Sequence, residues 1–267
     1  MKTKAIILKT KKKIFGELLG RNLSKLKGNG LDFKEFREYT YGDDAKKIDW
    51  KISAKINKPL VKEYNEEREL RIILAILKSG SLYFGSKKLK IETIAEIIST
   101  LSISALNEDN KIQLIFLGKN KKIFKPTKNK KSVYMFVDET LNQNYLEENY
   151  SQKDIEFLNS FKKSLLFIIS DFYEPIDFSK LKHETYIINV RDKFEEDPQF
   201  SGYVELIDPN NLNSINVNFT NKTKEKIKKN IKTIDENLEL QCKKLKIPYT
   251  KIYTDEDVIY KLIKLVR

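Results

Sequence analysis

Few residues in this sequence have the types and spacing that catalysis or phosphate binding would require. Gly28 and Gly30 are spaced as in a nucleotide-binding loop, but no predicted strand precedes them and no lysine-serine or lysine-threonine pair follows. His183, the only histidine, precedes a predicted strand, which separates it from the hydroxyl groups of Ser79 and Ser81. We therefore expect neither a nucleotide loop nor a serine–histidine–aspartate site, and no enzymatic activity.

Thiol chemistry is not expected either. Cys242 is the only cysteine, which excludes an internal disulfide and a cysteine metal cluster. It continues the apolar stripe of a predicted helix, which also contains Ile227, Ile231, Ile234 and Leu238. Such a position is typical of a small core residue, so Cys242 is predicted to be buried and unreactive.

The basic residues offer another chemistry, which is contact with phosphate groups. The chain of 267 residues has 51 Lys and Arg against 38 Asp and Glu, a net charge of +13. Lysine-rich runs occur at 11–13, 128–131 and 224–229. Because nearly all of the basic residues are lysines, a solvated lysine surface is the simpler interpretation, and nucleic-acid binding stays an alternative.

The hydropathy of the chain is that of a globular protein. Hydrophobic residues make up 40% and charged residues 33% of the sequence. No apolar stretch approaches the roughly 20 residues of a membrane helix. Ala5–Leu8 is too short for the apolar core of a signal peptide. These observations favour the cytoplasm.

The elements that position these residues alternate between strands and helices after residue 70. Apolar runs at Ile72–Leu77, Leu165–Ile169 and Tyr186–Val190, the last interrupted only by Asn189, predict buried strands. Lys90–Leu106 has the periodicity of a helix. The other predicted elements are strands at Lys111–Leu117, Lys121–Phe124 and Tyr249–Tyr253, helices near 131–145 and 151–162, a hairpin of Tyr203–Ile207 and Ile215–Phe219, a long helix capped by Thr223, and a last helix capped by Thr254.

This order predicts an α/β fold, a mostly parallel sheet with helices on both faces. Parallel strands end at the same edge of a sheet, and that edge is where such folds bind ligands. The segments after Leu77, Ile169 and Val190 should therefore meet there. They bring Asp171 and Asp192 near the two serines that follow Leu77.

The segment before residue 70 has a different character, with glycines, aromatic residues and charges mixed. It contains a glycine-x-glycine, a phenylalanine, an arginine-x-tyrosine, a glycine-aspartate-aspartate and an isoleucine-aspartate-tryptophan. The residues are Gly28, Gly30, Phe33, Arg37, Tyr39, Gly42, Asp43, Asp44, Ile48, Asp49, Trp50 and Ala54. This series resembles the N-terminal signature of the family called domain of unknown function 58. The chain departs from it at Lys46 and Lys55, where the family has arginine and its two-pronged donor.

The resemblance continues through the rest of the chain, over about residues 15–267. Ser170-Asp171-Phe172 and Arg191-Asp192 fall where the family has similar residues. It implies a small N-terminal β-rich or irregular segment over 1–70 and a von Willebrand factor A-like (Rossmann-like) domain over 71–267, with a hairpin insertion at about 201–219. It also implies genomic association with MoxR-type AAA+ ATPases and no established enzymatic activity.

A-like domains hold Mg²⁺ or Mn²⁺ with an aspartate-x-serine-x-serine motif and a later aspartate. The resemblance places Ser79, Ser81 and Asp171 at such a site, but Leu77 stands where the first aspartate belongs. One carboxylate and two hydroxyls make a poor site for a hard divalent cation. We therefore expect no metal cofactor, and predict instead that the serines cap the following turn and that Asp171 accepts backbone N–H bonds.

The sequence leaves two functions open and disfavours a third. The first is a non-enzymatic adaptor that binds a MoxR-type ATPase or its client, as the resemblance implies. Its candidate contact or interdomain residues are Arg37, Tyr39, Gly42, Asp43, Asp44, Asp49, Trp50 and Asp192. The second is nucleic-acid binding through the lysine-rich runs, and the third, enzymatic catalysis, is not expected.

Overall fold

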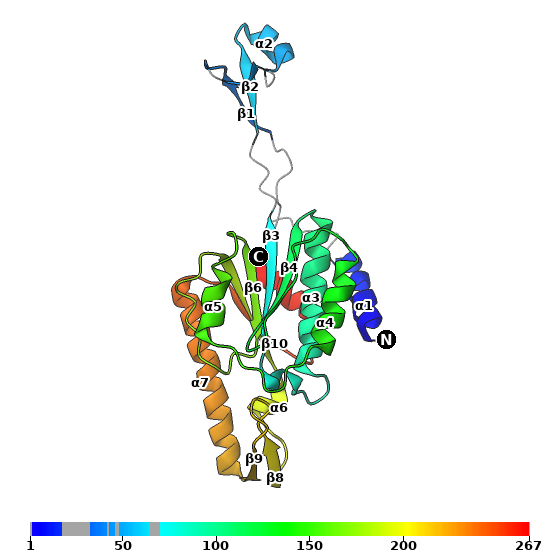
Figure 1. Ribbon diagram of the computed structural model, residues 1–267, viewed down its shortest axis with the longest axis vertical. Coiled ribbons are helices and arrows are strands. Elements are labelled where there is room, and N and C mark those ends of the chain that lie inside the picture. The colour runs from blue at the N-terminus through cyan, green and yellow to red at the C-terminus, as the bar shows by residue number, and fades with distance from the viewer. Residues whose placement is uncertain (1, 18–32, 42, 46–47, 65–69, 267) are drawn as a thin grey trace. The chain divides into compact units, whose positions relative to one another are not determined.

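The computed structural model describes residues 2–17, 33–41, 43–45, 48–64 and 70–266 (Figure 1). The chain forms two compact units, one of Met1–Leu26 with Arg71–Arg267 and one of Lys27–Leu70. The predicted division at residue 70 therefore needs a correction, because helix α1 (Lys2–Glu17) belongs to the larger unit. The physical reason is Ile7, which is fully buried in the core where α1 packs against α3 and α4.

The larger unit is built on a six-stranded sheet in the order β10-β7-β6-β3-β4-β5. Its strands are β3 (Arg71–Leu77), β4 (Lys111–Leu117), β5 (Lys122–Ile123), β6 (Leu165–Ser170), β7 (Glu184–Arg191) and β10 (Tyr249–Tyr253). All neighbours pair in parallel except β4 and β5. The predicted α/β class and mostly parallel sheet are confirmed.

Helices cover both faces of this sheet, as Figure 1 shows. The helices are α3 (Lys90–Asn107), α4 (Ser132–Asn142), α5 (Gln152–Leu158), α6 (Lys193–Glu196), α7 (Asn221–Leu245) and α8 (Val258–Val266). Along β3, Ile72, Leu74 and Ile76 pack with residues of α3, α4 and α8, whereas Ile73 and Ala75 pack with residues of α5 and α7. The strand is apolar from Ile72 to Leu77 because both of its faces are covered.

Two predicted helix caps are wrong by a few residues. The side chain of Thr220, not Thr223, caps α7 by accepting a bond from the amide of Thr223. Asp257, not Thr254, accepts the amides of the first turn of α8. Each helix begins about one turn away from its predicted start. Several hydroxyl or carboxylate residues near each start could act as the N-cap, so the sequence did not identify which one does.

A hairpin of β8 (Gly202–Ile207) and β9 (Ser214–Phe219) stands between α6 and α7, as predicted, and pairs in antiparallel register. Its tip returns to the strand ends of the sheet. The carbonyl of Pro209 accepts the amide of Glu147 at 2.9 Å, and the Asn210 side chain accepts the amide of Gly80 at 2.9 Å. The hairpin is therefore fastened at its tip as well as at its base.

The smaller unit has a two-stranded antiparallel sheet, β1 (Phe33–Glu38) with β2 (Leu60–Tyr64), and one short helix, α2 (Trp50–Ile56). Its described interior contains Leu60, Val61 and Ser53. The Ser53 hydroxyl accepts the amide of Leu60 at 2.8 Å and so joins α2 to β2.

Candidate functional site at the strand ends

The two serines after β3 have different roles. Ser79 caps the short 3₁₀ helix η3 (Gly80–Tyr83) by accepting the amide of Ser81, which confirms part of the prediction. Ser81 does not cap this turn with its side chain. Its hydroxyl donates to the Oδ2 atom of Asp171 at 2.5 Å and lies 2.7 Å from the Ser79 hydroxyl. The ends of β3 and β6 therefore meet, as the topology predicts.

A buried lysine lies at the centre of this edge. The Nζ atom of Lys90, the first residue of α3, is 2.7 Å from Oδ2 of Asp171 and 2.5 Å from Oε1 of Glu195. The side chains of Lys90 and Asp171 are fully inaccessible to solvent. Asp171 thus accepts from a lysine and a serine, and the predicted backbone N–H bonds are not found among the described residues. We call Ser79, Ser81, Lys90, Asp171 and Glu195 the strand-end cluster.

A second buried ion pair lies beside this cluster. Arg191, at the end of β7, donates to Asp235 of α7 at 2.7 Å, and Lys251 of β10 also reaches Asp235, at 3.0 Å. Burial would raise the pKa of Asp235, but the charges and hydrogen bonds of Arg191 and Lys251 outweigh it and lower the pKa. The ring of Tyr173 lies 4.3 Å from the Arg191 guanidinium and 5.2 Å from the Lys90 ammonium, so it faces both cations.

Asp192 fastens three loops together. Its Oδ2 atom accepts the amide of Ser86 at 3.0 Å and the hydroxyl of Thr254 at 2.6 Å, and its Oδ1 atom accepts the amide of Phe194 at 2.9 Å. Burial raises the pKa of Asp192, but these hydrogen bonds outweigh it and lower the pKa. Asp192 was predicted as a contact residue, and its described bonds are all within the larger unit.

The residues at this edge do not fit a divalent cation. The Oδ2 atom of Asp171 already holds the Lys90 ammonium and the Ser81 hydroxyl, so only its Oδ1 atom, which is buried and has no hydrogen-bond partner among the described residues, is left for an ion. Leu77 offers no ligand atom and Asp192 is engaged elsewhere. Over the described residues there is no group of three or more histidines, cysteines, aspartates and glutamates placed to hold a metal. An ammonium group supplies the positive charge that the buried carboxylates need.

A third buried pair lies at the ends of β3 and β4. Lys78 is fully buried, and its Nζ atom is 2.7 Å from Oε1 of Glu148, which also accepts the Asn120 amide group at 2.8 Å. Burial opposes the charge of Glu148, but Lys78 and Asn120 outweigh it and lower the pKa. A side chain at Gly118, whose φ is +150°, would come within 2.7 Å of this carboxylate.

The two other residues that could do chemistry have structural roles. His183 lies at the amino end of β7, opposite to the strand-end cluster, where its Nδ1 atom accepts the amide of Ser164 and its Nε2 atom faces the Leu158 carbonyl at 2.8 Å. Cys242 is 1% exposed, and burial raises its pKa to about 12. Both findings agree with the prediction that neither is a reactive group.

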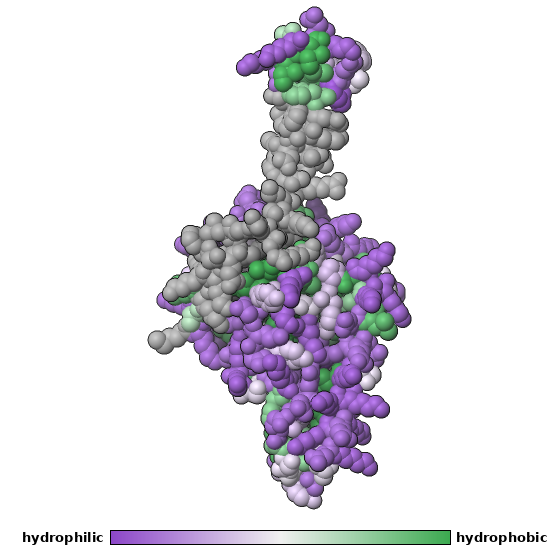
Figure 2. All heavy atoms as spheres, turned by 180° about the vertical axis from the view of Figure 1, so that it is seen from behind, coloured by the Kyte–Doolittle hydropathy of each residue, from purple (hydrophilic) through white to green (hydrophobic). Residues whose placement is uncertain are grey.

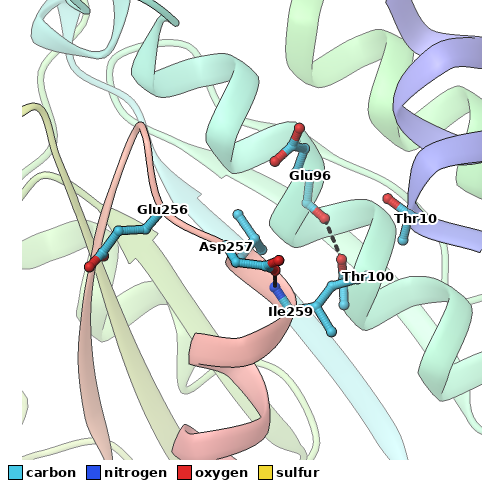
Figure 3. Close-up of a pocket in the computed structure, with 7 residues that line it drawn as sticks. Thr10, Glu96, Thr100, Glu256, Asp257 and Ile259 are labelled. Atoms are coloured by element: carbon cyan, nitrogen blue, oxygen red, sulfur yellow. Dashed lines mark hydrogen bonds between the residues drawn. The ribbon is translucent and has the colours of Figure 1, made fainter. Parts of the chain in front are cut away.

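One further small cavity does not add a site. It has a volume of about 30 Å³ and lies between α1, α3 and the turn before α8 (Figure 3). The Thr100 hydroxyl donates to the Glu96 carbonyl, and Asp257 accepts the amide of Ile259. A space of this size holds about one water molecule.

The signature residues of the smaller unit make hydrogen bonds within that unit. Arg37 donates two hydrogen bonds of 2.7 Å to Asp43, and this pairing lowers the pKa of Asp43 strongly. Asp49 caps α2 by accepting the amides of Lys51 and Ile52. Tyr39 donates its amide to the Pro59 carbonyl. Asp44 is exposed and also takes part in an interaction, and Gly42 lies outside the described residues.

Two aromatic residues of this unit are open to solvent in the described structure. Trp50, the first residue of α2, is 68% exposed, and Tyr41 is fully exposed. Large exposed aromatic residues are typical anchors of protein interfaces.

Comparison with known sequences assigns the chain. A family described as "Protein of unknown function DUF58" matches residues 35–237. The chain belongs to the DUF58 family. The region that matches contains the signature residues from Arg37 onward and the strand-end cluster.

Two known proteins are similar to part of the chain. The uncharacterized proteins Rv1480 of Mycobacterium tuberculosis and Mb1516 of Mycobacterium bovis are each 33% identical over 100 residues, 38% of this chain. The match spans 31% of the length of these relatives.

Among solved structures, BatB from Bacteroides thetaiotaomicron is 13% identical with a TM-score of 0.45, over 74% of this chain and 97% of that one. An aerotolerance-related membrane protein from Bacteroides fragilis is 12% identical with the same TM-score, over 74% and 96%. In the DUF58 protein itself, none of the described helices is both long and apolar enough to cross a membrane.

Sequence reasoning missed the lysines of this site. Lys90 was assigned only as the start of a helix, although it lies four residues before Ile94 on the buried face. Asp235 likewise falls on the apolar stripe of α7, between Ile231 and Leu238. A charged residue on an apolar stripe signals a buried partner of opposite charge, and that signal was available in both helices.

Proposed function

We propose that this DUF58 protein is a non-enzymatic adaptor, built on a von Willebrand factor A-like domain, that binds another protein. The observation that carries the proposal is the self-pairing of the strand-end cluster. Lys90 pairs with both Asp171 and Glu195, and Ser81 is bonded to Asp171. A nucleophile needs a free base beside it, and a metal needs free oxygen ligands, so this edge is better suited to hold a shape than to react.

The proposed partner is a MoxR-type AAA+ ATPase or its client, and this part rests on the family resemblance. The smaller unit supplies a candidate surface for it. Arg37 and Asp43 hold the loop that carries Tyr41, and Asp49 caps the helix that begins at Trp50. These pairings fix the backbone that carries two exposed aromatic side chains, which reduces the conformational entropy lost on binding. A cytoplasmic location belongs to the same proposal.

The test is affinity capture of the tagged full chain from native extract, with nuclease present, read by mass spectrometry. We expect a stoichiometric AAA+ ATPase or its client in the eluate and a loss of about tenfold or more with Trp50→Ala. Asp49→Asn serves as the matched variant, because asparagine caps a helix nearly as well as aspartate and the melting temperature should stay unchanged. An eluate that contains no protein partner would contradict the adaptor role.

Nucleic-acid binding is the second candidate, and the exposed lysines of α7 favour it. Binding driven by phosphate contacts weakens steeply as salt rises. We therefore expect that mixed DNA and RNA show no measurable affinity at physiological ionic strength. Binding that persists there, with a steep salt dependence below it, would favour this candidate over the adaptor.

A further inference from the structure

An apolar groove lies next to the strand-end cluster, between α7 and the β8–β9 hairpin. Its volume is about 450 Å³, within the range of ligand-binding clefts. Its walls include Phe84, Phe194, Phe200, Leu206, Ile227 and Ile231. Figure 2 shows a mostly hydrophilic surface with apolar patches at the end of the larger unit where the hairpin lies.

One wall of the groove is a row of aromatic rings. Phe84 lies 6.5 Å from Phe194, Phe194 lies 5.6 Å from Phe200, and Phe200 lies 4.3 Å from Phe219, measured between ring centroids. Phe84 is 39% exposed although it is a large apolar residue. Each ring fixes its neighbour, so the wall is preformed and an occupant would find a stable apolar surface.

The opposite wall is the first half of α7. The apolar stripe of this helix packs into the core only at its C-terminal half, where Leu238 and Cys242 are buried. Further toward its N-terminus, Ile227 and Ile234 line the groove instead and stay partly exposed. The hairpin adds Leu206, which is 38% exposed. The apolar stripe of α7 therefore extends beyond the part of the helix that packs against the core.

The charges around this helix half are positive. Residues 221–232 contain six lysines and a single acidic residue, Glu225. Lys224 and Lys228 face the segment before β8, through the Ser201 hydroxyl at 3.0 Å and Asp197 at 4.0 Å. On the other flank Lys222 and Lys226 are one turn apart and exposed, and no ion pair is found for them among the described residues.

We propose that this groove binds an acidic segment of a partner protein that inserts large apolar or aromatic side chains. The apolar walls select the anchors, and the lysine flank selects the charge of the segment around them. A second copy of the chain is disfavoured because each copy carries a net charge of +13. Nucleic acid is disfavoured because the groove walls offer carbon atoms where phosphate would need donors. The proposal rests on the adaptor role and names the chemistry of its partner.

The experiment selects a random displayed peptide library on the full chain and measures the affinity of the enriched peptides in solution. We expect sequences rich in Asp and Glu that carry Phe, Trp or Leu. The double variant Lys222→Glu/Lys226→Glu should weaken their binding by about tenfold, since two flanking charges are reversed. Glutamates in the first turns of a helix interact favourably with the positive end of the helix dipole, so we expect this variant to keep its fold.

The matched control is Lys162→Glu/Lys163→Glu, an equal change of charge in the exposed loop before β6, at the other end of the strands. It should leave the affinity unchanged. Ile227→Asp places a carboxylate on the apolar wall and should abolish binding without lowering the melting temperature, because Ile227 is not in the core. The variants thus test charge and apolar contact separately.

Several outcomes would overturn the proposal. They are no enriched peptide, enriched peptides that are basic or lack apolar anchors, or an equal loss of affinity in the control. If the chain binds single-stranded DNA or anionic vesicles and the Lys222→Glu/Lys226→Glu variant does not, the lysine flank binds another ligand. If the chain is a dimer and Ile227→Asp makes it a monomer, the groove binds a second copy of the chain. A native partner captured equally by all groove variants would refute the groove alone and leave the adaptor role standing.

Discussion

At the scale of single residues, Lys90 decides what the strand-end cluster can do. Its ammonium lies between two buried carboxylates, so removing it leaves Asp171 and Glu195 without a cation. We expect Lys90→Met to lower the free energy of unfolding by about 3–5 kcal/mol, as measured by urea denaturation. Lys88→Met is the matched control, because Lys88 pairs with Glu96 near the surface and its loss should cost about 1 kcal/mol or less.

The same residue provides a test of the metal interpretation. Lys90→Ala opens space beside Asp171, Glu195 and Ser81, which are oxygen ligands of the kind that Mg²⁺ and Mn²⁺ prefer. Millimolar Mn²⁺ should therefore raise the melting temperature of Lys90→Ala and leave that of the unmodified chain unchanged. If Mn²⁺ stabilises the unmodified chain equally, the ammonium does not exclude the ion and this interpretation is wrong.

Gly80 allows the hairpin tip to approach the strand ends. A Cβ atom at this position would lie 2.4 Å from the Pro209 carbonyl oxygen, which is backbone and cannot turn away. We expect Gly80→Ala to cost about 1–3 kcal/mol and to raise the rate of amide hydrogen exchange at 208–213. Unchanged exchange at the tip would show that the hairpin is not fastened there.

At the scale of elements, helix α2 depends on its cap. It has only seven residues, and Asp49 accepts two of its first amides. Asp49→Ala should lower the stability of the smaller unit by about 1 kcal/mol, while Asp49→Asn should be nearly neutral. Trp50 is the only tryptophan of the chain and follows the cap directly, so its fluorescence during urea unfolding reports this unit alone. Equal unfolding midpoints for both variants would contradict the role of the cap.

The elements of the sheet could be predicted because their signals are local. Ile72–Leu77 and Leu165–Ile169 are continuously apolar, Tyr186–Val190 is apolar except for Asn189, and each lies in a central strand. Helix α1 was missed because its burial depends on contacts of residues such as Ile7 with α3 and α4, which are far away in the sequence. A long-range contact of this kind leaves little trace in a single sequence.

The sequence predicted where the site lies, but not which residues pair with one another in it. The topology of parallel strands brings Ser81 and Asp171 together, and the structure confirms this. The partner of Asp171 could not be derived, because Lys90 precedes it by 81 residues and reads as an ordinary helix start. The position of Lys90 on the buried face of α3 indicates a buried charge, but it does not indicate which residue pairs with that charge.

At the scale of the whole molecule, the groove and the cluster share a residue. Glu195 lines the groove and accepts the Lys90 ammonium, and Tyr173 lines the groove while it faces Lys90 and Arg191. An occupant of the groove would therefore contact residues that touch ion pairs already buried from solvent. Because such an occupant binds the folded chain and not the unfolded one, binding should raise the stability of the strand ends.

The ion pairs also set how the molecule responds to acid. The pKa values of Asp192, Asp235 and Glu148 are lowered in the folded chain by their hydrogen bonds and paired charges. A carboxylate with a lowered folded pKa stabilises the fold fully above its unfolded pKa of about 4, and the contribution is lost as pH falls through the folded pKa. Glu195 acts in the opposite direction, because burial raises its pKa.

We therefore expect the free energy of unfolding to fall as pH decreases below about 4, since the unfolded chain then binds more protons than the folded one. Asp192→Asn removes one lowered group, and asparagine can still accept the amide of Phe194, so the fall should become shallower. Glu195→Gln removes the group of opposite sign, so the fall should become steeper. Urea denaturation at a series of pH values measures both slopes, and a common slope for the two variants would show that these buried carboxylates do not govern acid stability.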